Sequence, residues 1–243
     1  GSACVIASTP LEARDLLEHY GADPTRLCVN PPGVDLTTFS PGDREAARKE
    51  AGFGPGPLVV VAGRVQPLKG IDVALEAVAR LRRNVPDIHL AVVGGASGAA
   101  GSEELGRLRD RAANPDLAGA VSFRPAVPHT DVVPILRSAD VVHVPSRSES
   151  FGLVAVEAQA CGIPVVATAV GGLRHVVADG VSGVLVEGWD PADHAAALER
   201  VLVDDTWAAT LAAGTVPQAS RFGWESTTDR LLELYAGIVG ARA

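Results

Sequence analysis

Short apolar runs alternate with amphipathic stretches from residue 58 onward. The apolar runs have the length and Val-rich composition of buried strands, and they cover residues 58–62, 88–93, 121–123, 141–145, 164–167 and 183–186. Apolar side chains at helical spacing predict helices over residues 70–84, 102–113, 130–137, 151–160 and 173–178. Strands that alternate with helices in this way form right-handed βαβ units. The sequence therefore predicts the α/β class, with a doubly wound, Rossmann-like parallel sheet.

The residues before this region follow a different pattern. Short strands are expected at 3–8 and 27–30, with a helix between them that Thr9 caps and Gly21 ends. Residues 31–35 read Pro-Pro-Gly-Val-Asp, and consecutive prolines make a stiff turn that we interpret as a hinge.

A polar segment and a helical segment flank the alternating region. Residues 41–57 are rich in Gly and Pro and predict a linker or peripheral loop with one short helix at 44–51. Helices are expected from residue 191 to the end of the chain, with a break near Pro217. The last helix carries an amphipathic stripe that we expect to pack on another part of the protein, made of Trp224, Thr228, Leu231, Tyr235 and Ile238.

Composition and charge narrow the classes of function. A net charge of −8 at pH 7 argues against binding to a nucleic-acid backbone, which needs a basic face. The three cysteines fit neither a disulfide framework nor a zinc spacing, so we interpret them as buried thiols of a reducing, cytoplasmic compartment. No apolar run has the length of a membrane span, and no metal-binding motif is present. We therefore expect no nucleic-acid partner, no membrane contact, no bound metal and no cofactor.

Residues 145–164 hold the richest group of candidate functional side chains. Glu149 lies in the loop after a predicted strand, and Glu157 lies inside the helix that follows. In an open α/β sheet a ligand binds outside the carboxyl end of a strand, at a helix N-terminus with free backbone amides. The free amides here belong to Ser150, Phe151, Gly152 and Leu153. The amides favour an anionic group on the ligand, and the carboxylates favour hydroxyl groups. A sugar nucleotide has both, so we predict that this site binds one.

A second strand-to-helix loop supplies cations. Arg64 and Lys69 follow the strand at 58–62, and Gly63 and Gly70 let a ligand approach the backbone closely. Arg suits bidentate contact with phosphate, and Lys adds a point charge. On physical grounds alone, two solvated basic residues on an ordinary loop explain this sequence equally well.

Other candidates carry weaker signals. The glycine-rich residues 94–101 resemble a phosphate-binding loop only loosely, and a flexible loop is the alternative. His143 lies in an apolar strand and is interpreted as a core side chain, whereas His129 and His175 lie in loops and fit either a structural or a functional role.

Taken together, these groups resemble the donor-binding half of a retaining glycosyltransferase of family 4. The matching text is Gly-Arg-Val-Gln-Pro-Leu-Lys-Gly at 63–70 and Glu-Ser-Phe-Gly-Leu-Val-Ala-Val-Glu at 149–157. That family has the GT-B architecture, in which two Rossmann-like domains face each other across a cleft. Within it, the resemblance extends to members that move N-acetylglucosamine from UDP-N-acetylglucosamine to an inositol phosphate in mycothiol synthesis. Aminocyclitol glycosyltransferases look similar.

The resemblance implies a role for each candidate residue. Arg64 and Lys69 would hold the donor diphosphate and stabilise the departing UDP. Glu149 would bind hydroxyls of the transferred sugar, and Glu157 would bind both ribose hydroxyls. Further donor contacts would come from Gly63, Ser97, Gly98, Val127, Ser150, Phe151, Gly152 and Leu153, with the uracil near Val127 and the phosphates bordered by Ser97 and Gly98. The alternative for both carboxylates is a purely structural role at a helix start and on the surface.

The same resemblance divides the chain. Residues 1–40 correspond to the tail of an acceptor domain and a linker, and residues 41–222 to the nucleotide-sugar-binding domain. Residues 223–243 correspond to a helix that packs back toward the acceptor domain. The small polar acceptor would be bound by that domain, which this sequence lacks. We therefore expect a fragment whose partner is the missing N-terminal domain or a second copy of the chain.

Three other functions stay open from the sequence. One is a mannosyltransferase that uses GDP-mannose and a lipid acceptor. Another is a non-catalytic module that binds nucleotide sugars. The third is a nucleotide-sugar epimerase, which needs carboxylate bases near the sugar, where only Glu149 is in place.

Overall fold

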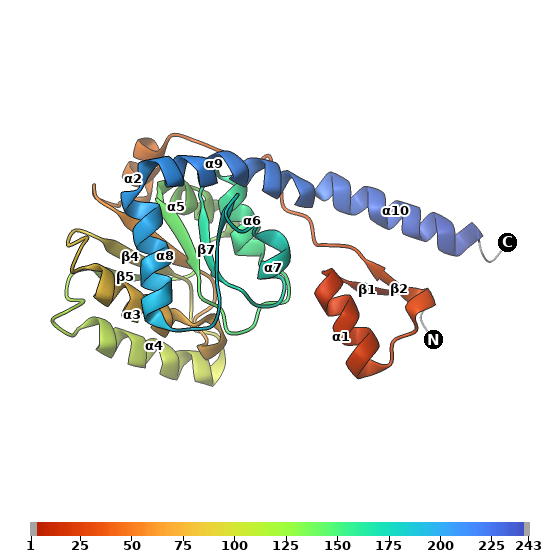
Figure 1. The fold of residues 1–243 in the computed structure, drawn as a ribbon, viewed down its shortest axis with the longest axis horizontal. Coiled ribbons are helices and arrows are strands. Elements are labelled where there is room, and N and C mark those ends of the chain that lie inside the picture. Colours follow the sequence, from red (N-terminus) through yellow and green to blue (C-terminus); the bar gives the residue numbers. More distant parts are fainter. Residues whose placement is uncertain (1–3, 241–243) are drawn as a thin grey trace.

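Six parallel strands form the central sheet of the computed structural model, which describes residues 4–240 (Figure 1). They are β3 (Leu58–Ala62), β4 (His89–Val93), β5 (Val121–Arg124), β6 (Val141–Val144), β7 (Val165–Thr168) and β8 (Gly183–Val186). Their order across the sheet is β5-β4-β3-β6-β7-β8. The chain therefore winds outward from β3 to β5, returns to the centre at β6 and winds outward in the other direction. This confirms the predicted doubly wound, Rossmann-like sheet.

Helices cover both faces of this sheet, which explains its continuous Val-rich strands. Val60 and Val142 belong to one buried cluster, and Val59 and Val141 belong to the other, as expected for successive side chains of a strand. The first face is covered by α2 (Arg44–Ala51), α5 (Val132–Ser138), α6 (Leu153–Ala160) and α7 (Leu173–Val176). The opposite face is covered by α3 (Ile71–Leu81), α4 (Gly98–Ala112) and α8 (Pro191–Val203), and α9 (Asp205–Ala219) contacts both α8 and α6.

A small separate unit precedes the sheet body. It consists of β1 (Val5–Ala7), α1 (Pro10–Tyr20), η1 (Pro24–Arg26) and β2 (Leu27–Val29), and the two strands pair in parallel. The predicted caps of α1 are confirmed, because the Thr9 hydroxyl accepts from the Glu12 amide at 3.1 Å and Gly21 is left-handed with φ 64°. The predicted strand began at residue 3, which lies outside the described residues.

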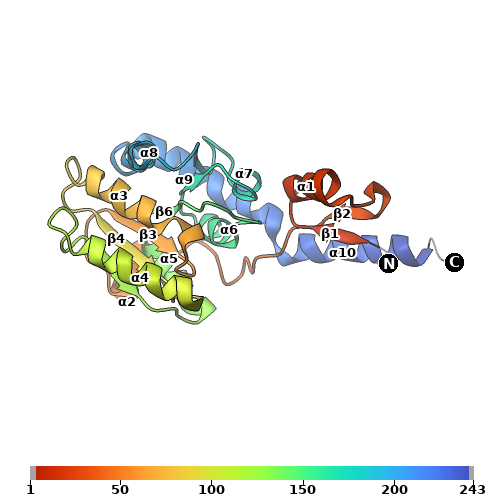
Figure 2. The same ribbon diagram turned by 90° about the horizontal axis from the view of Figure 1, so that it is seen from below.

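The final helix, α10 (Trp224–Gly240), extends from the sheet body on the same side as this unit (Figures 1 and 2). Its first turn holds the predicted hinge, since the Asn30 amide donates to the Thr227 carbonyl at 3.2 Å and the Thr227 hydroxyl donates to the Pro31 carbonyl at 3.0 Å. The two chain segments that leave the sheet body are thus joined where they leave it. The predicted end of this helix at residue 243 lies outside the described residues.

Several predicted helix details are wrong. The helix predicted at 102–113 begins at Gly98, because Gly101 packs its first turn so closely on the Val65 carbonyl that a Cβ would lie 2.5 Å from the oxygen. The second half of the glycine-rich stretch, residues 98–101, is therefore helical and not a flexible loop. Thr130 caps nothing, since a 3₁₀ turn at His129–Asp131 precedes α5 and no side chain caps that helix.

The C-terminal helices also differ from prediction. α9 continues through Pro217 to Ala219, and the interruption falls at the 3₁₀ turn η4 (Ser220–Phe222). The less exposed face of α10 consists of the buried Thr227 and the half-buried Ser226, Leu231, Leu234 and Ile238. The predicted stripe shares only Leu231 and Ile238 with this face, because Trp224 and Tyr235 are more than half exposed and Thr228 is exposed.

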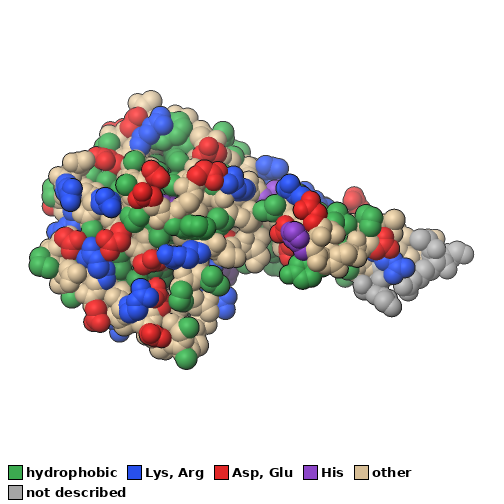
Figure 3. Space-filling view, turned by 60° about the horizontal axis from the view of Figure 1, so that its bottom comes forward, with side chains coloured by type: hydrophobic (Ala, Val, Ile, Leu, Met, Phe, Trp, Pro, Cys, Tyr) green, Lys and Arg blue, Asp and Glu red, His purple; other side chains and the backbone are tan. Residues whose placement is uncertain are grey.

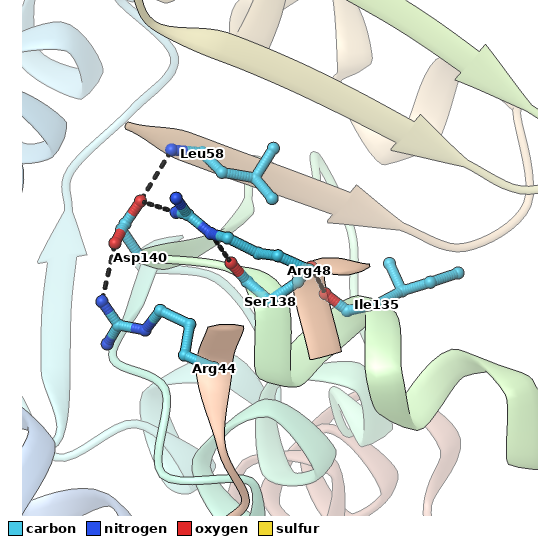
Figure 4. A network of polar contacts seen from close by, with 6 residues as sticks. All are labelled: Arg44, Arg48, Leu58, Ile135, Ser138 and Asp140. Carbon is cyan, nitrogen blue, oxygen red and sulfur yellow. Dashed lines mark hydrogen bonds and ion pairs between the residues drawn. The ribbon is translucent and has the colours of Figure 1, made fainter. Parts of the chain in front are cut away.

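One carboxylate joins the amino-terminal edge of the sheet to α2 (Figure 4). Asp140, just before β6, accepts hydrogen bonds at 2.7 Å from Arg44, from Arg48 and from the backbone amide of Leu58. The Arg48 guanidinium also donates to the Ser138 carbonyl at 3.0 Å, at the end of α5. A single side chain thereby holds the start of β3 and both arginines of α2, and Arg48 in turn holds the end of α5.

Removal of this carboxylate is expected to destabilise the sheet body. Asp140→Ala leaves Nη2 of Arg48, a side chain that is 16% exposed, and the Leu58 amide without their acceptor, which costs about 3 kcal/mol. Asp140→Asn keeps an acceptor for the amide and should lose about half as much. Urea unfolding measures both, with Asp116→Ala as a control, because the Asp116 side chain is 51% exposed and its ion pair with Arg111 contributes under about 1 kcal/mol. Equal losses in Asp140→Ala and the control would contradict this account.

Candidate functional site

The loops after β3 and β6 meet where the strand order reverses. β3 and β6 are direct neighbours, with Val59 opposite Val141, and residues 63–70 and 145–152 leave them at the carboxyl edge. Ligands bind at this position in open α/β sheets because the chain diverges there to the two sides. Both loops therefore lie at one edge of the sheet.

The backbones of the two loops touch. Gly70 is left-handed with φ 62°, and a Cβ on it would lie 2.0 Å from the Pro145 carbonyl oxygen. Next to this contact, the Arg147 amide donates to the Leu68 carbonyl at 2.7 Å. Only glycine meets both the conformation and the spacing at position 70.

The Arg147 side chain adds a clamp between the same loops. Its guanidinium donates to the two carboxylate oxygens of Asp72 at 2.8 and 2.7 Å and to the Pro67 carbonyl at 3.0 Å. Burial raises the pKa of the Asp72 carboxyl, but the hydrogen bonds and charge of Arg147 outweigh burial, so this pKa lies below its usual value. Sequence reasoning missed this pair, because a contact between two loops leaves no periodic signal.

A cavity of about 340 Å³ opens between the two loops. Its lining includes eight of the predicted site residues, namely Gly63, Arg64, Lys69, Glu149, Ser150, Phe151, Gly152 and Leu153. It also includes Ser146 and His143, which were not proposed as site residues. The structure therefore brings the predicted cations, one predicted carboxylate and the predicted amides to one place.

Lys69 and Glu149 form an ion pair across this cavity. The Lys69 ammonium lies 2.7 Å from Glu149 Oε2, and their side chains are 25% and 17% exposed. The buried Ser146 hydroxyl also donates to Oε2 at 3.3 Å. Glu149 Oε1 accepts no hydrogen bond from the described residues. One oxygen thus holds the carboxylate in place, and the other remains available to a ligand hydroxyl.

The rest of the cavity wall favours an anion. Arg64 is exposed and makes no hydrogen bond or ion pair with any residue between 4 and 240. Over that same range, the amides of residues 150–153 have no hydrogen-bond acceptor, and they lie at the N-terminus of α6. Gly152, with φ 100°, turns the chain into this helix. A fixed cation and a helix N-terminus are both attracted to negative charge.

Four predicted residues lie outside the cavity lining. Ser97 and Gly98 form the start of α4, beside the β3 loop, where the Ser97 amide donates to the Val65 carbonyl at 3.4 Å. Val127 lies in the loop after β5 and packs on the core. Glu157 is buried in α6, and its Oε1 lies 2.7 Å from Nε2 of His129.

A larger hollow, of about 790 Å³, lies at the opposite, amino-terminal edge of the sheet. Its main polar groups are already paired, His89 with Ser122 at 2.8 Å and the Arg124 guanidinium with the carbonyls of Ala51 and Gly52. The smaller cavity, with unpaired amides and an unpaired cation, is therefore the better candidate.

Comparisons with known proteins cover the part of the chain that contains both loops. The family described as Glycosyl transferases group 1 matches residues 43–214, which contain both loops. The chain belongs to the group 1 glycosyl transferases. It is 50% identical over 236 residues to a D-inositol 3-phosphate glycosyltransferase of Geodermatophilus obscurus, covering 95% of this chain and 52% of that protein. It is 49% identical over 240 residues to the protein of the same name from Frankia alni, covering 97% of this chain and 59% of that one.

Solved structures of glycosyltransferases share the fold. A sucrose-phosphate synthase from Thermosynechococcus elongatus has a TM-score of 0.88 at 32% identity, over 99% of this chain and 59% of that one. Anabaena HepE in complex with UDP and glucose has a TM-score of 0.88 at 25% identity, over 97% of this chain and 63% of that one. This group 1 glycosyl transferase thus spans about half the length of the curated relatives it matches.

Two features of this group 1 glycosyl transferase concern membranes and metals. Among the described helices, none combines the length and apolarity that a bilayer crossing requires. Within residues 4–240, no three His, Cys, Asp or Glu side chains gather in a metal-binding arrangement.

A pair of buried histidines lies below the cavity. His143 is fully buried, as predicted for a core side chain, and its Nε2 lies 2.9 Å from Nδ1 of His194. His194 Nε2 donates to the Gly188 carbonyl at 3.1 Å, so His194 Nδ1 is the acceptor and His143 Nε2 carries a proton. His143 Nδ1 is buried without a partner among the described residues. Both rings are therefore neutral.

The contact between the two loops predicts unequal effects of two glycine substitutions. Gly70→Ala combines left-handed strain with a backbone collision and should lose about 3 kcal/mol or more. Gly52→Ala is the matched control, because Gly52 has φ 68° but nothing within 4 Å of an added Cβ, so it should lose about 1 kcal/mol. Urea unfolding compares the two variants, and equal losses would exclude the collision as a constraint.

The histidine pair predicts lower stability in acid. Burial, and for His143 also the charge of His194, lowers the folded-state pKa of both rings below 6.5. The unfolded chain takes up protons near pH 6.5 that the folded chain cannot bind, so stability is full above about pH 7 and falls as the pH decreases. The free energy of unfolding should decrease between about pH 7.5 and 5.5, and less so in His143→Leu. Parallel pH profiles for wild type and variant would show that this pair is not responsible.

Proposed function

We propose that this chain is the donor-binding part of a retaining, family 4 glycosyltransferase that takes a hexose from a UDP-sugar. The observation that carries the proposal is the convergence of Arg64, Lys69, Glu149 and the unpaired amides of residues 150–153 on one cavity. The cations and amides suit a diphosphate, and Glu149 Oε1 suits a sugar hydroxyl. No other cavity described above offers both.

The proposed catalysis of sugar transfer depends on the negative charge that develops on the leaving group. As the bond between sugar and phosphate breaks, negative charge grows on the departing UDP, and fixed cations and amide dipoles stabilise it more than they stabilise the donor. Arg64 and Lys69 are the side chains for this task. We assign retention to front-face attack within an ion pair, with the donor phosphate taking the acceptor proton. Glu149 is held by Lys69 and binds hydroxyls in this scheme; it is not a covalent nucleophile.

The relatives support a particular donor and acceptor. Proteins named D-inositol 3-phosphate glycosyltransferase are 49–50% identical to this chain, and HepE has been solved with UDP and glucose. We assign the donor as UDP-N-acetylglucosamine and the acceptor as an inositol phosphate or an aminocyclitol. The nucleotide would lie along the carboxyl edge, with Ser97 and Gly98 bordering the phosphates, Val127 beside the uracil and Glu157 on the ribose.

The acceptor would be bound by a part of the enzyme that is not in this chain. Residues 1–40 and 223–243 would belong with that acceptor domain, and residues 41–222 would bind the donor. Support comes from apolar side chains that remain exposed on the small unit and on α10, among them Tyr20 at 79% and Val239 at 68%. Exposed apolar surface of this kind marks a contact with another domain or chain.

Binding calorimetry tests the donor site. UDP-N-acetylglucosamine should bind to the wild-type chain, and Arg64→Ala and Lys69→Ala should each weaken binding by about tenfold through loss of a phosphate contact. Arg83→Ala, an exposed arginine beyond the far end of α3, is the matched control and should leave affinity unchanged. Tighter binding of GDP than UDP would favour the mannosyltransferase alternative. Unchanged affinity in both site variants would refute the assignment of the cavity.

A further inference from the structure

The buried carboxylate of Glu157 has one oxygen engaged and one free. Oε1 lies 2.7 Å from Nε2 of His129, and because a carboxylate only accepts, the imidazole Nε2 must carry the proton. No group of the described residues donates a hydrogen bond to Oε2. This oxygen is also not fully buried, so a ligand can reach it. The side chain of Glu157 is only 7% exposed, so little but this oxygen is open to a ligand.

Helical spacing places Glu157 on the same face of α6 as a residue of the cavity wall, although Glu157 itself is not part of that wall. Glu157 follows Leu153 by one helical turn, so both side chains are on the same face of the helix, and Leu153 lines the cavity. Side chains in a helix lean toward its N-terminus, which here is the cavity end. A ligand that is held by the amides of residues 150–153 and extends along α6 would meet Glu157 next.

The His129 ring also contacts a buried aromatic side chain. It lies 4.9 Å, centroid to centroid, from the ring of the buried Phe39. Phe39 is held by the turn that begins at Asp35, whose carboxylate accepts from the amides of Thr37 and Thr38 at 2.9 and 3.1 Å. His129 itself is 69% exposed, so its position depends on Phe39 and Glu157 and not on burial.

We propose that His129 is a positioning residue that holds Glu157 Oε1 so that Oε2 faces a vicinal diol, and thereby sets the preference of this site for ribose over 2′-deoxyribose. The proposal rests on the proposed function, in which Glu157 binds the ribose. His129 acts through Glu157 and need not touch the ligand. Without its N–H, the carboxylate is free to rotate, and it loses the orientation that distinguishes a diol from a single hydroxyl.

The test compares the affinities of UDP and 2′-deoxy-UDP by calorimetry. Wild-type protein should bind UDP about tenfold more tightly, because one hydrogen bond to a charged group is lost with the 2′-hydroxyl. His129→Gln keeps an N–H donor and should keep most of this ratio. His129→Phe keeps the ring contact with Phe39 but has no donor, so its ratio should fall by about threefold or more. His19→Ala, at an exposed position in α1, is the matched control and should leave the ratio unchanged.

The ratio separates positioning from a general structural role. If His129 merely stabilises the fold, His129→Phe weakens both ligands equally and the ratio stays at the wild-type value, which overturns the inference. Glu157→Gln separates the two proposals. If Glu157→Gln loses the preference for UDP over 2′-deoxy-UDP and His129→Phe keeps it, only the role of His129 is refuted. Failure of the wild-type chain to bind UDP refutes the proposed function instead.

Discussion

The close contact between two loop backbones is the constraint on which the candidate site depends. With Gly70 against the Pro145 carbonyl, no side chain separates the loops after β3 and β6. Lys69 precedes this contact and Glu149 follows it by four residues, so their charged ends meet at 2.7 Å. The pair of Arg147 and Asp72 closes the loops on one side. The sheet supplies neighbouring strands, but this contact is what sets the distance between a cation and a carboxylate from loops 80 residues apart.

An acidic chain can still present an attractive site to an anion. The net charge of −8 is a property of the whole surface, and in Figure 3 acidic and basic side chains are interspersed over the visible face of the sheet body. At the cavity, Arg64 and a run of unpaired amides dominate at short range, where a Debye length of about 8 Å limits the influence of distant charges. The Lys69 charge is shared with Glu149 until a ligand arrives, so it adds less to the initial attraction than Arg64 does.

Sequence reasoning predicted what local patterns determine and missed what contacts between loops determine. The six strands, the doubly wound order and the meeting of the 63–70 and 145–152 loops follow from strand periodicity and the rule for α/β sheets. The start of α4 at Gly98 was missed because it depends on Gly101 meeting the Val65 carbonyl, a tertiary contact. Arg147 with Asp72 was missed for the same reason. His129 was left undecided because its partner, Glu157, is 28 residues away in another element.

The two glutamates of the motif share one physical arrangement. Glu149 has one oxygen held by Lys69 from the β3 loop, and Glu157 has one oxygen held by His129 from the β5 loop. In each case the second oxygen accepts no hydrogen bond from the described residues. A carboxylate that is held by one oxygen loses little rotational freedom when a hydroxyl binds the other, so less free energy is spent on ordering the side chain. Because both holding groups come from other βα loops, the spacing of the glutamates along the chain reveals neither partner.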